Sequence, residues 1–193
     1  MEKAVNKDLA ETLLRALGEQ LAAVDERFEI VVIGGSGLLA LGLVERTTRD
    51  VDVVALRSGS EFQRPDPLPE ALRLARSRVA RDFDLPEDWL NPGPADLLDF
   101  GLPEGFVDRL ESRSYGSGLT VYFASRFDQI HFKLYATVDQ GAGKHSADLE
   151  ALAPTREELL QAARWTRTHD PSPGFEEVLR RVLSHFGVDD GDL

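Results

Sequence analysis

Residues 29–56 read EIVVIGGSGLLALGLVERTTRDVDVVAL, and this stretch decides the fold of the chain. It contains two apolar runs, EIVVI at 29–33 and VDVVAL at 51–56, and both predict buried β-strands. Gly34 and Gly35 end the first run, and Ser36 is placed to cap a short apolar helix, GLLALGLV. The predicted order is therefore a strand, a Gly-Gly-Ser turn, a helix and a second strand that begins with acidic residues.

Asp50 and Asp52 lie on either side of Val51 at the start of the second strand. Because side chains alternate along a strand, both carboxylates project from one face, about 6–7 Å apart along the backbone, while Val51 and Val53 face the core. Neighbouring carboxylates repel each other unless a cation lies between them. Mg²⁺ supplies that charge and also holds triphosphate oxygens. Asp50 and Asp52 are therefore predicted to be metal ligands and catalytic residues.

The Gly-Gly-Ser turn predicts a phosphate-binding element. Its two glycines have no side chain that blocks close approach, and the helix that follows presents free backbone N–H groups. We expect Gly34, Gly35 and Ser36 to contact the nucleotide, with Thr48 and Arg49 as further nucleotide-binding candidates. Taken alone, each feature is more often a plain turn or a solvated edge strand, but their order along the chain favours a site.

Two other phosphate-binding patterns fit less well. Gly35-Ser36-Gly37-Leu38-Leu39-Ala40 matches the G-x-G-x-x-A pattern of dinucleotide-binding folds. In those folds the ribose-binding acid lies at the end of the second strand, whereas Asp50 and Asp52 precede the apolar run here. The Walker pattern fails because no Gly-Lys-Ser/Thr follows the glycines.

Beyond this stretch, the chain predicts an α+β protein with helices in its C-terminal part. A hairpin is expected from the strands 113–115 and 119–123, whereas residues 84–110 carry many Pro and Gly residues and predict no clear element. Helices are expected from the Asn6 cap to about residue 25, near 69–82, from Ser125, from Ser146 through Asp148, after a Thr155–Glu158 capping box, and in a last segment that ends at Gly187.

Composition narrows the possible functions. The 193 residues carry 22 basic and 34 acidic side chains, a net charge of −12, which argues against a protein that coats nucleic acid non-specifically. The absence of cysteine excludes disulfides, a thiolate nucleophile and a cysteine-based zinc site. No stretch resembles a signal peptide or a membrane span, so a cytoplasmic protein without a membrane partner is expected.

The motifs together resemble those of a known superfamily. Gly34-Gly35-Ser36 followed by Asp50-Val51-Asp52 resembles the first motif of DNA polymerase β-like nucleotidyltransferases. More narrowly, the chain resembles the AbiEii-type toxin nucleotidyltransferases of bacterial toxin–antitoxin and phage-defence systems. Their later motif, an Asp followed five residues on by Lys, is matched by Asp128 and Lys133, and their last motif by Asp148 after a basic residue.

This resemblance, which covers about residues 29–152, implies both a fold and a reaction. The fold would be a nucleotidyltransferase-like mixed β-sheet flanked by helices, with a catalytic domain over 1–153 and C-terminal helices over 154–193 packed on it. The reaction would be Mg²⁺- or Mn²⁺-dependent transfer of a nucleotide from an NTP to an acceptor. The favoured acceptor is the 3′ end of tRNA, and the protein would be a toxin with a cognate antitoxin partner.

The resemblance also implies roles for the later residues. Lys133 would contact the nucleotide and stabilise charge on the transferring group or on pyrophosphate. Asp148 would orient or deprotonate the acceptor hydroxyl, or complete the metal shell. The chain departs from the pattern in two respects: the gap from Ser36 to Asp50 is long, and the strand 119–123 carries no acid.

Simpler interpretations stay open for each later residue. Asp128 follows Ser125 by three residues, which is a capping arrangement; Lys133 lies off the apolar stripe, as a solvated residue does. Asp148 near a helix start is favoured by the macrodipole alone. Any RNA would need a confined basic strip, for which the candidates are Arg126, Lys144, Arg164 and Arg167.

Two other functions also stay open. One is nucleotidyl transfer to a protein or a small-molecule hydroxyl, and the other is a non-enzymatic relative that only binds. The presence of Asp50, Asp52 and Lys133 disfavours the second.

Overall fold

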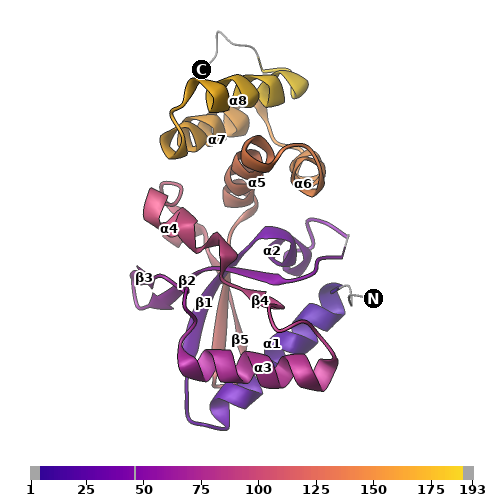
Figure 1. Ribbon diagram of the computed structural model, residues 1–193, viewed down its shortest axis with the longest axis vertical. Coiled ribbons are helices and arrows are strands. Elements are labelled where there is room, and N and C mark those ends of the chain that lie inside the picture. The colour runs from indigo at the N-terminus through magenta and orange to yellow at the C-terminus, as the bar shows by residue number, and fades with distance from the viewer. Residues whose placement is uncertain (1–4, 46, 189–193) are drawn as a thin grey trace. The chain divides into compact units, whose positions relative to one another are not determined.

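A computed structural model describes residues 5–45 and 47–188 of the chain. The chain divides into two compact units, Met1–Ser125 and Arg126–Leu193, which are described separately (Figure 1). The predicted catalytic domain over 1–153, with the remaining helices packed on it, stays a prediction. Among the described residues, no helix has both the length and the apolar character needed to cross a membrane.

The first unit is built on a mixed β-sheet, as predicted. Within the described residues the sheet has six strands: β1 (Phe28–Ile33), β2 (Val51–Ser58), β3 (Glu61–Gln63), β4 (Leu90–Asn91), β5 (Glu111–Tyr115) and β6 (Leu119–Phe123). Their order is β3-β2-β1-β6-β5, and the short β4 pairs with the start of β2. β1 runs antiparallel to β2 and parallel to β6, while β4 runs parallel to β2.

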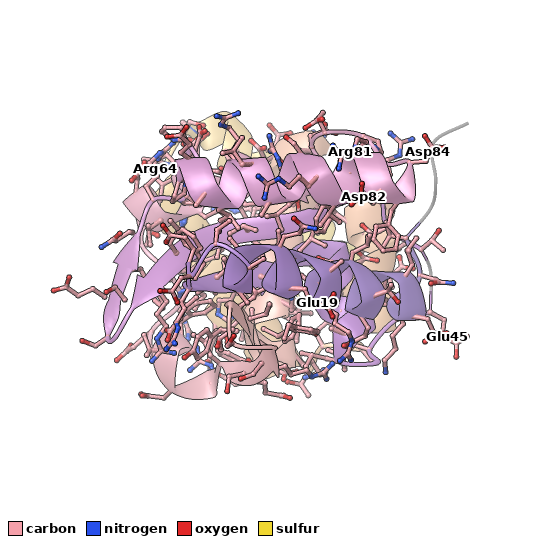
Figure 2. All side chains as sticks on the ribbon, turned by 90° about the horizontal axis from the view of Figure 1, so that it is seen from below. Glu19, Glu45, Arg64, Arg81, Asp82 and Asp84 are labelled. Atoms are coloured by element: carbon pink, nitrogen blue, oxygen red, sulfur yellow. The ribbon has the colours of Figure 1, made fainter. Side chains whose placement is uncertain are left out.

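Helices α1 (Lys7–Ala22) and α3 (Glu70–Phe83) lie side by side in the first unit, with Glu19 marking α1 and Asp82 marking α3 (Figure 2). The predicted Asn6 cap is confirmed, because its side chain accepts a hydrogen bond from the Leu9 backbone N–H at 2.9 Å. Both helices and the sheet share one apolar core, which includes Leu13, Leu17, Leu72, Val79, Ile30, Val32, Val53 and Phe123.

Helix α2 (Gly34–Ala40) begins earlier than the sequence predicts. The expected cap at Ser36 is wrong: Ile33 is the N-cap residue, and the Ser36 hydroxyl donates to the Ile33 carbonyl at 3.5 Å. The reason is Gly34, whose φ of +72° lets the chain turn directly from β1 into the helix, a backbone conformation that other residues rarely adopt.

The segment 84–110, which predicts no clear element, contains short ones. These are β4, the 3₁₀ turns Gly93–Ala95 and Phe106–Arg109, and α4 (Asp96–Phe100). None is long enough to produce a hydrophobic period, so pattern alone does not reveal them.

The second unit is helical in its described part. It contains α5 (Arg126–Gln140), α6 (Lys144–Ala151), α7 (Arg156–His169) and α8 (Pro173–His185). The predicted capping box is confirmed: the Thr155 hydroxyl accepts from the Glu158 N–H, and the Glu158 carboxylate accepts from the Thr155 N–H. The prediction that Ser146 opens α6 is wrong. The helix begins at Lys144, and Ser146 caps it from its third position by accepting from the Gly143 N–H at 3.0 Å.

Candidate active site

Asp52 is the second residue of β2, and Asp50 directly precedes the strand. Val51 and Val53 are 1% and 0% exposed and belong to the core, as the alternating pattern predicts. Asp50 and Asp52 are both partly exposed. Their carboxylates therefore lie where solutes reach them, at the beginning of a strand whose residues 51 and 53–56 are buried.

A third polar side chain, Asn91, joins the two carboxylates. Its amide nitrogen lies 3.3 Å from Oδ2 of Asp50 and 3.3 Å from Oδ1 of Asp52, and donates to both. Because one nitrogen reaches both groups, the two carboxylates converge on one point. Asn91 is not among the residues predicted for the site, since it lies in the Pro- and Gly-rich segment that predicts no strand.

The position of Asn91 follows from the pairing of β4 with β2. Asp52 and Asn91 are register partners in this parallel pair, and the Val51 N–H donates to the Trp89 carbonyl at 2.6 Å. The Asn91 side-chain carbonyl in turn accepts from the Gly93 N–H at 2.9 Å. The Asn91 side chain is thus positioned both by the pairing of β4 with β2 and by the hydrogen bond from Gly93.

Gly34 brings the backbone of the Gly-Gly-Ser turn against Asp52. Ile33, the last residue of β1, is the register partner of Asp52, and the chain turns immediately after it. A Cβ placed on Gly34 would collide with the Asp52 carboxylate and would lie 3.2 Å from its Cγ. The predicted phosphate-binding turn and the predicted metal-binding acid are therefore direct neighbours.

The other predicted nucleotide-binding residues differ in exposure. All residues of α2, including Gly35 and Ser36, are buried. Thr48 is 8% exposed and forms a two-way backbone bridge with Val5, while its hydroxyl lies 3.4 Å from the Asp50 carbonyl. Arg49 is exposed. Thr48 thus helps to fix the backbone that leads into Asp50, and nucleotide contact by these residues stays a prediction.

In the second unit, Lys133 and Asp148 form a buried ion pair. Nζ of Lys133 lies 2.7 Å from Oδ2 of Asp148, and their side chains are 4% and 1% exposed. The interpretation of Lys133 as a solvated residue is therefore wrong. Asp148 is the fifth residue of α6, beyond the first turn, so a helix-dipole role alone does not explain it.

Arg126 and Asp128 begin α5 in different settings. Asp128 is fully buried in the first turn. The Arg126 guanidinium donates to the carbonyls of Leu152 and Ala153 and pairs with Glu158 at 2.6 Å. Arg126 therefore joins the start of α5 to the α6–α7 connection. Lys144 and Arg164 are exposed, and Arg164 and Arg167 line a surface pocket of about 320 Å³ with Thr168, Asp170, Pro171 and Glu176.

The first-unit site suits a hard divalent cation by its donor set. Mg²⁺ prefers carboxylate oxygens from one or two residues and keeps further positions for water and substrate phosphates. Asp50 and Asp52 provide two converging carboxylates, and the neighbouring Gly34 leaves the approach free of a side chain. Thiolate-binding metals find no ligand here because the chain has no cysteine.

A strand, a Gly-Gly turn into a helix and paired acids on the adjacent strand are the features of a nucleotidyltransferase. Comparison with family models supports this class: the family described as "Nucleotidyltransferase of unknown function (DUF6036)" matches residues 12–144. The match covers more than half of the chain, and the protein therefore belongs to this nucleotidyltransferase family. The matched range includes Gly34, Asp50, Asp52, Asn91 and Lys133.

Neither the curated proteins nor the solved structures gave a match.

Proposed function

We propose that the protein transfers a nucleoside monophosphate from an NTP to an acceptor hydroxyl, with Asp50 and Asp52 holding Mg²⁺. The observation that carries the proposal is the convergence of both carboxylates on one point beside the backbone of Gly34. Two negative groups held this close are stabilised by a cation, and the open backbone beside them suits phosphate oxygens.

The reaction forms a bond between the acceptor oxygen and the α-phosphorus and breaks the bond from that phosphorus to pyrophosphate. The chemistry that bound Mg²⁺ supplies is neutralisation of the triphosphate and orientation of the leaving group. Asp50 and Asp52 hold the cation, and the backbone at Gly34 and Gly35 together with Ser36 contacts the phosphates. The pyrophosphate leaves with the bonding electrons, and the acceptor proton passes to a base.

Lys133 and Asp148 are the second unit's candidates for this reaction. A buried ammonium group is suited to stabilising charge on a transferring phosphoryl group, and a carboxylate is suited to accepting a hydroxyl proton. The observation that supports both roles is their burial as a pair, since charged side chains are seldom buried without a structural or chemical reason.

For the acceptor we favour the 3′ end of tRNA, in a toxin of the AbiEii type that a cognate antitoxin partner controls. The support is the resemblance of the motifs, Asp128 and Lys133 included. With Arg126 engaged by Glu158 and backbone carbonyls, and Arg167 paired with Glu176 at 3.6 Å, the basic strip for RNA reduces to Lys144 and Arg164. RNA affinity should therefore fall only shallowly with salt, because few phosphate contacts release few counterions.

A labelling experiment tests the proposal. The purified protein is incubated with each α-³²P-labelled NTP and Mg²⁺, together with total tRNA, cellular protein or small-molecule hydroxyls. Asp50→Asn and Asp52→Asn serve as controls that keep the shape of the side chains. Label on tRNA with the wild type alone supports the full proposal, and label on protein or a small molecule corrects the acceptor. If no NTP bound to the protein and no acceptor was labelled, the proposed reaction would be wrong.

A further inference from the structure

The geometry points to Asn91 as a positioning residue that holds Asp50 and Asp52 in a converged arrangement ready for a cation. The metal-binding part of this inference rests on the function proposed above; the part that concerns the two carboxylates does not. Asn91 is partly exposed and touches both acids at equal distances of 3.3 Å.

The hydrogen bonds fix which way the Asn91 amide points. A primary amide has two N–H donors on its nitrogen and one carbonyl acceptor. In Asn91 the nitrogen faces the two carboxylates, and the carbonyl accepts from the Gly93 N–H at 2.9 Å. A flipped amide would place its oxygen against both carboxylates and its N–H groups against another N–H. All three partners therefore select one orientation.

The loop around Asn91 is shaped to the amide. A Cβ added at Gly93 would lie 3.0 Å from Oδ1 and 3.2 Å from Nδ2 of Asn91, tighter than ordinary van der Waals contact. A side chain at Gly93 would therefore press directly on the group that bridges the acids.

Helix α3 forms two hydrogen bonds with β4 and the residue before it. The Trp89 indole N–H donates to the Arg76 carbonyl at 3.1 Å, and the Arg76 guanidinium donates to the Leu90 carbonyl at 3.2 Å. Trp89 and Leu90 are 1% and 0% exposed. The core and α3 therefore fix the position of the two-residue strand β4, and with it the position of Asn91.

A neutral amide at this position suits a cation site better than either charged alternative. Its N–H groups reduce the repulsion between Asp50 and Asp52 but leave both negative charges available to a metal ion. A lysine in its place would compete with the metal, and a third carboxylate would add to the repulsion. Asn91 therefore keeps two acids close together while the site holds no cation.

The experiment combines metal-free stability with metal affinity. Asn91→Ala is made in the wild type and in Asp52→Asn, and denaturation midpoints are measured in chelator-treated buffer as a double-mutant cycle. We expect Asn91→Ala to lower the midpoint more in the wild-type background, because only there do two charges face each other. Mn²⁺ affinity, measured by calorimetry, should fall about tenfold, as it does when a group that orients a metal ligand is removed.

Two further variants keep the test decisive. Asn91→Asp preserves side-chain shape; it should lower the metal-free midpoint, and added Mn²⁺ should raise that midpoint more than in the wild type. Ser172→Ala removes the N-cap of α8 in the second unit, where the hydroxyl accepts from the Phe175 N–H, and should leave Mn²⁺ affinity unchanged. Equal midpoint shifts of Asn91→Ala in both backgrounds, or unaltered Mn²⁺ affinity, would overturn the inference. A wild-type protein that binds no Mn²⁺ or Mg²⁺ would reject the metal site, while the cycle would still decide whether Asn91 holds the carboxylates together.

Discussion

Lys133 and Asp148 bury opposite charges 2.7 Å apart, on two different helices of the second unit. Each side chain supplies a counter-charge to the other away from water. A variant that lacks either one therefore changes both the stability of the fold and any chemistry at this position, and the two effects need separate measurement.

Removing one partner of this pair should be costly, whereas removing both should not. We expect Lys133→Met and Asp148→Leu each to lower the free energy of unfolding by about 3–5 kcal/mol, since each takes the counter-charge 2.7 Å away from a buried charge. The double variant should lie within about 1 kcal/mol of the wild type. Urea denaturation checks this, and additive losses in the double variant would contradict it. If the folded double variant transferred nucleotide at the wild-type rate, neither residue would have a catalytic role.

Substitution of Gly34 should disturb Asp52 as well as the backbone. Gly34 and Gly42 both have φ of +72°, but among the described residues a Cβ at Gly42 meets only the Lys7 ammonium, at 4.0 Å. Gly42→Ala should thus carry only the cost of the left-handed backbone, about 1–2 kcal/mol. Gly34→Ala should cost about 1–3 kcal/mol more from the clash and should weaken metal-dependent nucleotide binding. Equal stability losses for the two variants would argue against the close approach.

Neutralising either acid should abolish metal-dependent nucleotide binding without harming the fold. Asp50→Asn and Asp52→Asn keep an oxygen that can accept from Asn91, while the repulsion between two carboxylates disappears. We expect both variants to be at least as stable as the wild type in metal-free buffer. Calorimetric titration with an NTP and Mg²⁺ provides the measurement, and wild-type affinity in both variants would reject the assignment.

Glu158 should give the second unit a pH-dependent stability. Burial alone raises the pKa of Glu158, but hydrogen bonds from Arg126 and Thr155 outweigh it and hold that pKa below its ordinary value. The folded state therefore binds this proton less readily than the unfolded state does. The resulting stabilisation is fully present above the unfolded pKa of about 4.3 and is lost as the pH falls through the folded value.

We therefore expect the stability difference between the wild type and Glu158→Gln to be largest near neutral pH and to shrink in acid. Denaturation at a series of pH values between neutrality and about pH 3 measures it. Glu157→Gln, in the same helical turn, controls for loss of a carboxylate near a helix start. A difference that stays constant over this range would show that the charge on Glu158 contributes nothing.

The sequence predicted those parts of the site that depend on local pattern. The two apolar strands, the Gly-Gly turn and the alternation that separates Asp52 from Val53 all follow from neighbouring residues, and the structure has each of them. Asn91 could not be found this way. It lies 39 residues beyond Asp52, on a strand too short to show a period, and only tertiary pairing brings it to the acids.

The cap predictions failed for a related reason. Serine is a good N-cap residue, but at Ser36 and Ser146 a glycine nearby changed where the helix starts. Gly34 starts its helix two residues before Ser36. Gly143 is itself the N-cap residue of α6, and the Ser146 hydroxyl accepts from its backbone N–H. The direct ion pair of Lys133 with Asp148 does not follow from the pattern of either helix, because their burial depends on the packing of α5 against α6.

The two tryptophans lie one in each unit, so the chain has a built-in optical reporter for each half. Trp89 is almost fully buried two residues before Asn91, and Trp165 packs in an aromatic group in which the tilted ring of His169 is centred 4.1 Å away. Replacing one tryptophan with phenylalanine leaves the other as the only tryptophan that fluoresces. Fluorescence of the Trp165→Phe protein would then follow β4 and the acids beside it, and that of the Trp89→Phe protein would follow the helical unit, as each one unfolds.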